Sequence, residues 1–284
     1  MPLDRGYASS QAEGMELWTT APDGSSHFAR REGAGPVPVL LVHGFPFDHG
    51  QWEPQLEALR GTATMLAPDL RGLGASDGAR EPGSARLSDY TDDLVRWLDQ
   101  LGWERAVVAG LSMGGYIAFE FVRRHPGRLI GLVLADTSPA ADTEAVRADR
   151  RATSERVAAE GMGAVVENLL AKVLGPTTQR SRPEVRARLL RMMSAAPLPG
   201  VRAALEAMAG RPDSTPTLGS IAVPTLVIVG EEDSLTPPAR AEAITAGIAG
   251  ARLSIIPQAG HVPPLENPEA FNQAMEEFLA GVLP

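Results

Sequence analysis

The sequence predicts an α/β fold: a mostly parallel, doubly wound sheet with a helical cap inserted late in the chain. Short, near-continuous apolar runs, typical of strands buried on both faces, alternate with segments of helical periodicity. Such alternation indicates a parallel sheet with helices on both faces. Between residues 139 and 219 the apolar runs stop, and Ala, Arg, Glu, Met and Leu dominate. This stretch predicts several helices between two strands of the sheet.

Each apolar run has the length of an ordinary strand and ends at a turn or at a helical pattern. Segments 15–19 and 26–31 are expected to add antiparallel edge strands. The buried strands are predicted at 37–42, 64–67, 105–109, 129–135, 225–229 and 252–256.

Three helices are marked by apolar spacing and by their ends. The first is expected to begin with Ser88 as its cap and to end at Gly102, with an apolar face that includes Tyr90 and Leu94. The second follows Ser112 and stops before a His-Pro pair, since the residue before proline avoids helical geometry. The last has Phe271, Met275, Phe278, Leu279 and Val282 on one face.

These elements divide the chain into two predicted domains. Residues 1–138 and 220–284 form the core, and residues 139–219 form the cap over its carboxyl edge. Four cap methionines could line an adaptable apolar pocket or simply pack between helices: Met162, Met192, Met193 and Met208.

Composition excludes several classes of function. The chain has 284 residues, a net charge of −9 and no cysteine, so disulfides, thiolate metal sites and a cysteine nucleophile are ruled out. The acidity argues against nucleic acid or an anionic membrane as a partner. No apolar run could span a bilayer, no secretory signal is recognisable, and a cytoplasmic protein without metal or cofactor is predicted. The oligomeric state cannot be derived from the sequence.

The pattern Gly110-x-Ser112-x-Gly114 is the strongest chemical signal. It follows an apolar strand and precedes a helix, which is the setting of a nucleophile elbow. The sharp turn exposes the serine hydroxyl at the N-terminus of the helix, where a developing negative charge is favoured. Ser112 is therefore the predicted nucleophile.

A serine hydroxyl needs a base, and the base needs an acid to orient it. Of the five histidines, His261 is favoured as the base, because it follows the last strand at the carboxyl edge of the sheet. The acid is expected in a loop after a strand, between serine and histidine. Asp233 is favoured, and Asp136, after the preceding strand, is the main alternative. Glu231 and Glu232 are further candidates, unless they are solvated loop charges.

An oxyanion hole requires two backbone N–H groups. One is expected from Met113, the residue after the nucleophile. The other is expected from Phe45, in the loop His43-Gly-Phe-Pro after the strand at 37–42. His43 is expected to hold this loop by hydrogen bonds rather than to transfer protons.

Taken together, these motifs resemble the α/β-hydrolase superfamily over nearly the whole chain. The resemblance includes the order Ser112, Asp233, His261 and the segment Asp69-Leu-Arg-Gly-Leu-Gly-Ala-Ser, which looks like a structural turn. The elbow segment is similar to that of small carboxylesterases, 3-oxoadipate enol-lactonases and cofactor-free haloperoxidase-like esterases. A serine at the elbow departs from haloalkane dehalogenases and epoxide hydrolases, which have aspartate there.

The resemblance implies a carboxylesterase acting on a small-molecule ester through an acyl-enzyme. The alternatives are a 3-oxoadipate enol-lactonase-like lactone hydrolase, a haloperoxidase or perhydrolase, and a non-enzymatic ligand receptor on the same fold. Because an enol-lactone substrate is anionic, the lactonase alternative requires a cationic cap residue in the pocket. Arg147, Arg150 and Arg151 are candidates, unless they are merely exposed helix residues.

Overall fold

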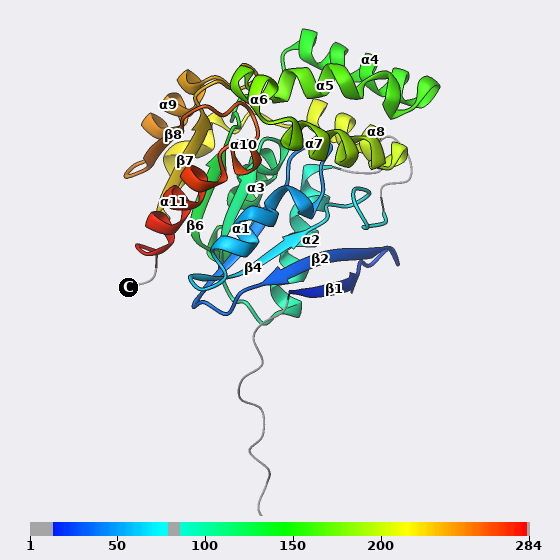
Figure 1. Ribbon diagram of the computed structural model, residues 1–284. Coiled ribbons are helices and arrows are strands. Elements are labelled where there is room, and N and C mark those ends of the chain that lie inside the picture. Colours follow the sequence, from blue (N-terminus) through cyan, green and yellow to red (C-terminus); the bar gives the residue numbers. More distant parts are fainter. Residues whose placement is uncertain (1–13, 79–85, 283–284) are drawn as a thin grey trace, which may run out of the picture.

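The computed structural model describes residues 14–78 and 86–282 and has one eight-stranded sheet at its centre (Figure 1). The strand order is β1-β2-β4-β3-β5-β6-β7-β8. The strands are β1 (Met15–Thr20), β2 (Ser26–Glu32), β3 (Val37–Val42), β4 (Ala63–Pro68), β5 (Ala106–Leu111), β6 (Leu129–Ala135), β7 (Thr225–Gly230) and β8 (Arg252–Ile256).

The sheet is parallel from β4 to β8, and only β1 and β2 run antiparallel to their neighbours. Every residue of β5 and of β7 is buried, because helices cover both faces of the sheet there. The carboxyl ends of β5, β6 and β7 consequently lie side by side at one edge. The predicted fold class and strands are confirmed.

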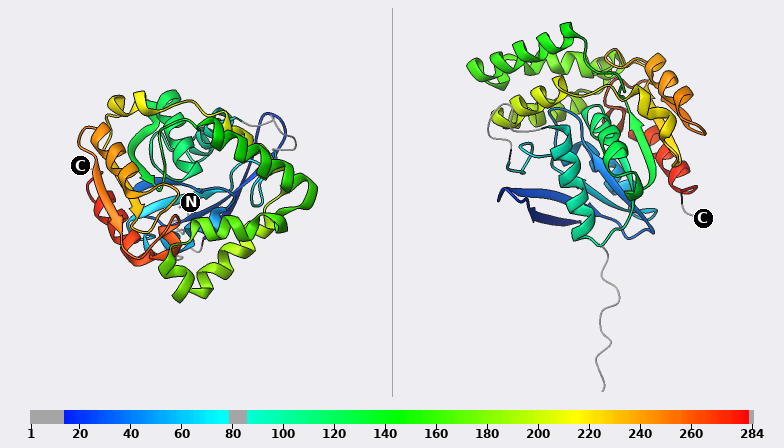
Figure 2. Two further views of the ribbon diagram at one scale, coloured as in Figure 1. Left: turned by 90° about the horizontal axis from the view of Figure 1, so that it is seen from above. Right: turned by 180° about the vertical axis from the view of Figure 1, so that it is seen from behind.

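Two sets of helices cover the sheet, one on each face (Figures 1 and 2). One face packs against α2 (Leu87–Gln100), α3 (Met113–Arg124) and α9 (Pro238–Gly247), and the other packs against α1 (Glu53–Ala58) and α11 (Pro268–Leu279). A short helix, α10 (Pro263–Glu266), precedes α11, and single turns lie at His49–Trp52 and Pro126–Arg128.

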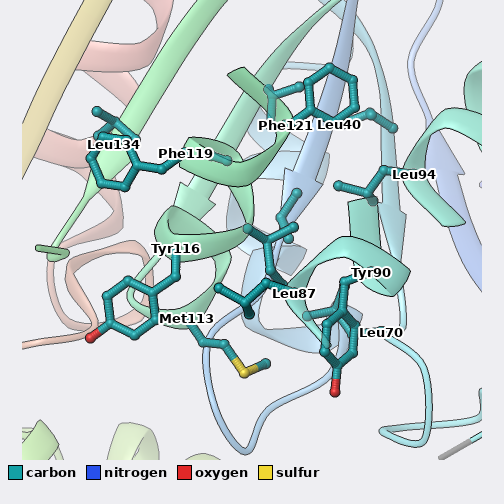
Figure 3. Close-up of a cluster of buried hydrophobic side chains, with 14 of the residues drawn as sticks. Leu40, Leu70, Leu87, Tyr90, Leu94, Met113, Tyr116, Phe119, Phe121 and Leu134 are labelled. Carbon is teal, nitrogen blue, oxygen red and sulfur yellow. The ribbon is translucent and has the colours of Figure 1, made fainter. Parts of the chain in front are cut away.

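The face under α2 and α3 contains the larger apolar cluster (Figure 3). Tyr90 and Leu94 of α2 belong to this cluster together with Phe121 of α3, which lies beside Leu40 of the sheet, and all four are at most 1% exposed. Full burial of one such side chain contributes about 1.5–3 kcal/mol. The apolar face predicted for α2 is therefore correct. Its predicted cap is wrong, since the helix begins at Leu87 and Ser88 lies inside it. There the Asp89 carboxylate instead accepts the backbone N–H of Arg86 at 2.8 Å.

All of the helices between β6 and β7 lie over the carboxyl edge of the sheet (Figure 1). They are α4 (Glu144–Glu160), α5 (Val166–Val173), α6 (Pro176–Ser181), α7 (Pro183–Ala195) and α8 (Leu198–Ala209), with single turns at Met162–Ala164 and Thr215–Ser220. The division into a core (1–138 and 220–284) and a cap (139–219) stays a prediction, and "cap" denotes these helices below. No helix in the described ranges is both long and apolar enough to cross a membrane.

Candidate active site

Ser112 sits in a strained turn between β5 and α3. Its φ of 54° and ψ of −110° lie in a region that residues with side chains rarely adopt. The two glycines are required by close packing: a Cβ on Gly110 would lie 2.2 Å from the Gly114 carbonyl, and one on Gly114 would lie 2.2 Å from the Val42 carbonyl. The Ser112 N–H donates to the Ala135 carbonyl at 2.9 Å, which anchors the turn to β6.

Ser112, His261 and Asp233 form a continuous chain of hydrogen-bonding atoms. Oγ of Ser112 is 2.8 Å from Nε2 of His261, and Nδ1 of the same ring is 2.8 Å from Oδ2 of Asp233. The carboxylate can only accept, so the proton on the neutral ring belongs on Nδ1. Nε2 is then free to accept the serine proton. The structure thus brings the three predicted residues together.

The Asp233 carboxylate is buried but well supplied with donors. Oδ1 accepts the backbone N–H groups of Leu235 and Thr236, and Oδ2 accepts the Thr236 hydroxyl at 2.5 Å. Burial alone would raise the pKa of Asp233, but the charge and hydrogen bond of His261 and the Thr236 donors outweigh it, so that pKa lies well below its usual range. Asp233 therefore stays ionised beside the imidazole.

The cap supports the loop that contains His261. The backbone N–H of His261 donates to the Val173 carbonyl at 2.8 Å, at the end of α5. Glu266, which is 1% exposed, accepts the N–H of Gly175 at 2.8 Å and that of Val262 at 3.0 Å. Burial raises the pKa of Glu266 above its ordinary value. The position of His261 thus depends on a cap segment that is distant in sequence.

The two predicted oxyanion donors flank the serine. In the described ranges no acceptor is assigned to the N–H of Phe45 or of Met113, the first residue of α3, whose N–H has no partner within the helix. The loop before Phe45 is fixed by His43, whose Nδ1 lies 2.8 Å from the Gly44 carbonyl and whose Nε2 accepts the Leu70 N–H at 2.9 Å. His43 is fully buried and has the structural role expected of it.

A cavity of about 320 Å³ opens onto Ser112 and His261 between the core and the cap. Its apolar lining residues are Phe45, Tyr116, Val146, Leu169, Val173, Leu205, Met208 and Leu235. Its charged lining includes Asp142, Arg150 and Arg211, and the single carboxylate pairs with both arginines: Asp142 lies 2.6 Å from Arg150 and 2.5 Å from Arg211. The Arg211 guanidinium also lies 3.9 Å from the centre of the Tyr116 ring.

Comparison with known proteins identifies the architecture. A family model described as the alpha/beta hydrolase fold matches residues 37–268. The chain belongs to this family. A thermophilic esterase from Thermogutta terrifontis, solved with malate bound, is similar to it at 41% identity and a TM-score of 0.88, over 95% of this chain and 99% of that one.

Relatives of this alpha/beta hydrolase differ in the substrate that their names give. The 3-oxoadipate enol-lactonase 1 of Acinetobacter baylyi is 27% identical over 86% of this chain and 89% of its own length. The pimeloyl-[acyl-carrier protein] methyl ester esterase of Edwardsiella ictaluri is 30% identical over 88% and 95%. By their names, the first acts on an enol-lactone and the second on a methyl ester carried by an acyl-carrier protein, and both names support a hydrolase.

Only some of the cap methionines and arginines that the sequence suggested for the pocket of this hydrolase are found there. Met208 lines the cavity, whereas Met162 and Met193 are buried in apolar clusters and Met192 packs against one of them. Arg150 borders the cavity but is already paired. Arg147 and Arg151 line a separate groove on the outer side of the cap, between α4 and α8. Thus one methionine and one arginine of those named contact the cavity.

Two groups of side chains in the described part of the chain lie close enough to share a metal ion, and in both the carboxylates already have protein donors. Asp48, His49 and Asp69 form one group, in which Asp69 accepts the N–H groups of His49 and Ala75 as well as the His49 ring at 2.8 Å. Asp136, Asp233 and His261 form the other. Hydrogen bonding within the fold accounts for the first group.

Proposed function

We propose that this alpha/beta hydrolase is a carboxylesterase that uses Ser112 as nucleophile, His261 as base and Asp233 as the orienting acid. The observation that carries the proposal is the pair of 2.8 Å contacts that join these residues beside an apolar cavity. The identity of 41% to an esterase supports it. The substrate is a small-molecule ester, and the chemistry requires no metal or cofactor.

The proposed reaction proceeds through an acyl-enzyme. Nε2 of His261 accepts the serine proton as Oγ attacks the ester carbonyl, and the N–H groups of Phe45 and Met113 stabilise the oxyanion. The imidazolium returns its proton to the departing alkoxide. Water then attacks the acyl-enzyme, transfers a proton to Nε2, and the acid is released as Ser112 regains its proton.

The cavity sets the expected acyl length. Its volume of about 320 Å³ is at the small end of ligand pockets, which span roughly 300–1,000 Å³. Short acyl chains such as acetyl and butyryl fit beside Leu205 and Met208, whereas a decanoyl chain would need the cap to open. We therefore expect p-nitrophenyl acetate and butyrate to be better substrates than the decanoate.

The first test replaces the nucleophile. Ser112→Ala should lower kcat on p-nitrophenyl butyrate by about 10⁴-fold or more while the thermal unfolding temperature is retained, because the residue is half-buried in the pocket. A serine-directed phosphonate should label the wild type once, at Ser112, by mass spectrometry. Label on another serine would contradict the assignment, and tight binding with negligible turnover would favour a ligand receptor.

A second candidate substrate is a lactone or ester that bears a carboxylate. Lys172 of α5 and Arg240 of α9 also line the cavity. Arg240 is bound by the Ser138 hydroxyl at 3.1 Å, and within the described ranges neither cation has a carboxylate within 4.0 Å. The enol-lactonase relative and the malate in the esterase structure agree with an anionic ligand. These two residues replace the arginines suggested by the sequence.

Recognition of a substrate carboxylate can be tested by removing the two positive charges. Lys172→Gln with Arg240→Gln should raise KM for 3-oxoadipate enol-lactone or a hemisuccinate ester by about 10-fold or more, since a charged hydrogen bond contributes about 1.5–3 kcal/mol. KM for neutral p-nitrophenyl butyrate should change less than 2-fold, because this substrate has no carboxylate to pair with the two exposed cations. Equal effects on both substrates would contradict this recognition while leaving the esterase assignment intact.

A further inference from the structure

Asp136 follows β6 directly and is held against the loop that contains Asp233. It is 1% exposed, and its φ of 45° lies in the left-handed region, which residues with side chains seldom adopt. Its backbone N–H donates to the Ile228 carbonyl at 3.0 Å, and its Oδ1 accepts the Gly230 N–H at 2.9 Å. Asp136 therefore connects the carboxyl ends of β6 and β7.

Two buried carboxyl groups consequently lie beside one imidazole. An oxygen of Asp136, an oxygen of Asp233 and a ring nitrogen of His261 all lie within 4.8 Å of one another. Glu266 is the other acidic group that acts on Asp136, and like charges at such distances cannot all be ionised in a buried site. One of the carboxyl groups must hold a proton.

The donors decide which group is protonated. Asp233 accepts from Leu235, from both the backbone and the hydroxyl of Thr236, and from His261. Asp136 accepts from Gly230 alone, and its Oδ2 is buried with no hydrogen-bond partner in the part of the chain that the structure describes. Each donated hydrogen bond favours the ionised form, so the charge belongs on Asp233. Burial and the neighbouring Asp233 charge hold the pKa of Asp136 well above its ordinary value, in agreement.

We propose that Asp136 is a neutral positioning residue, which keeps a proton on Oδ2, directs it toward the Asp233 carboxylate and so limits the negative charge beside His261 to one. The proposal rests on the proposed triad. Asp136 neither contacts substrate nor transfers a proton. It supplies a donor to Asp233 in a place where an ionised carboxylate would overstabilise the imidazolium and delay its return of the proton to the leaving group.

The decisive variant is Asp136→Asn, which is neutral at every pH and retains a donor. We expect its kcat/KM on p-nitrophenyl butyrate to stay within about 3-fold of wild type, and the midpoint of the acidic limb of its pH profile to stay within about 0.3 units, since neither the charge nor the donor is lost. A downward shift of one unit or more would overturn the proposal, because it would mean that wild-type Asp136 is ionised.

Asp136→Ala is the matched variant without a donor. Its acidic limb should move to higher pH by about half a unit or more, since Asp233 loses a donor and interacts more strongly with the imidazolium. A profile identical to wild type in a folded Asp136→Ala protein would show that the residue positions nothing and would also overturn the proposal.

An infrared measurement tests the proton without relying on activity. At neutral pH the wild type should show the carbonyl band of a buried protonated carboxyl, and Asp136→Asn should lose it. Asp142→Asn is the control: Asp142 is also buried but is paired with two arginines, so the band should remain. Retention of the band in Asp136→Asn would assign the proton elsewhere and overturn the proposal. This result stands even if the protein hydrolyses no ester.

Discussion

At the scale of single residues, sequence reasoning predicted the three residues that the structure brings together, but not those that hold them in place. Ser112, Asp233 and His261 could be predicted because the chain order and the turn after each strand restrict the choice. Thr236 could not, although it lies only three residues after Asp233, because a threonine in a loop has no distinguishing pattern. Its hydroxyl donates to Oδ2 of Asp233 and lies 3.3 Å from Nδ1 of His261.

Thr236→Val therefore tests the support of the acid. Valine has nearly the same shape and keeps the backbone N–H bond to Oδ1, so only the hydroxyl is lost. We expect kcat to fall about 10-fold, because a hydrogen bond to a charged group contributes about 1.5–3 kcal/mol. KM and the unfolding temperature should change little. Thr236→Ser, which keeps the hydroxyl, should stay near wild type, and a fully active Thr236→Val would mean that the backbone donors suffice.

At the scale of elements, the strands of the core were predictable because each one is marked by a pattern of neighbouring residues. Strands such as β5 and β7 are buried on both faces and therefore read as continuous apolar runs. The start of α2 was misplaced because Ser88 resembles a cap, whereas in the structure the Arg86 backbone N–H donates to the Asp89 carboxylate. A pattern of residue types cannot tell which of two adjacent polar side chains turns back to the chain.

The sequence predicted that the cap is helical, but not which of its side chains line the cavity. Its apolar residues face both neighbouring helices and the cavity, and helical spacing is the same in either case. This is why Met208 reaches the cavity while Met193, on α7, is fully buried against the core. The contact between the Val173 carbonyl and the His261 N–H joins residues 88 positions apart, and Glu266 bonds Gly175 across 91 positions. No local pattern encodes such distances.

At the scale of the whole molecule, buried carboxylates stabilise the core, the cap and the site, each within itself, although the chain is acidic overall. Asp69 fixes the loop after β4, Asp142 pairs with arginines from α4 and from the segment after α8, and Asp233 orients His261. In each case burial opposes ionisation, but histidine or arginine charges and donated hydrogen bonds outweigh it and lower the pKa of the carboxyl.

These lowered pKa values predict acid-labile stability. A carboxyl with a lower pKa in the folded than in the unfolded state contributes stability that is fully present above the unfolded value of about 3.9 and is lost as the pH falls through the folded value. The free energy of unfolding, measured with urea, should therefore decrease steeply below about pH 4. Asp136 and Glu266 have raised pKa values and act in the opposite sense, favouring the folded state as the pH falls toward 4.

Asp142→Asn isolates one of these contributions. At pH 7 the variant leaves Arg150 and Arg211 without their buried partner and should lose about 3–5 kcal/mol of unfolding free energy. As the pH falls below about 4, Asp142 takes up a proton in the unfolded chain before it does so in the folded wild type, so the difference between the two proteins should shrink. Asp149→Asn is the control, since Asp149 is exposed on α4 beside Arg150, and this variant should unfold like wild type throughout. A difference that is constant from pH 7 to pH 3 would mean that Asp142 contributes shape and hydrogen bonds, and that its charge contributes nothing to the stability of the cap.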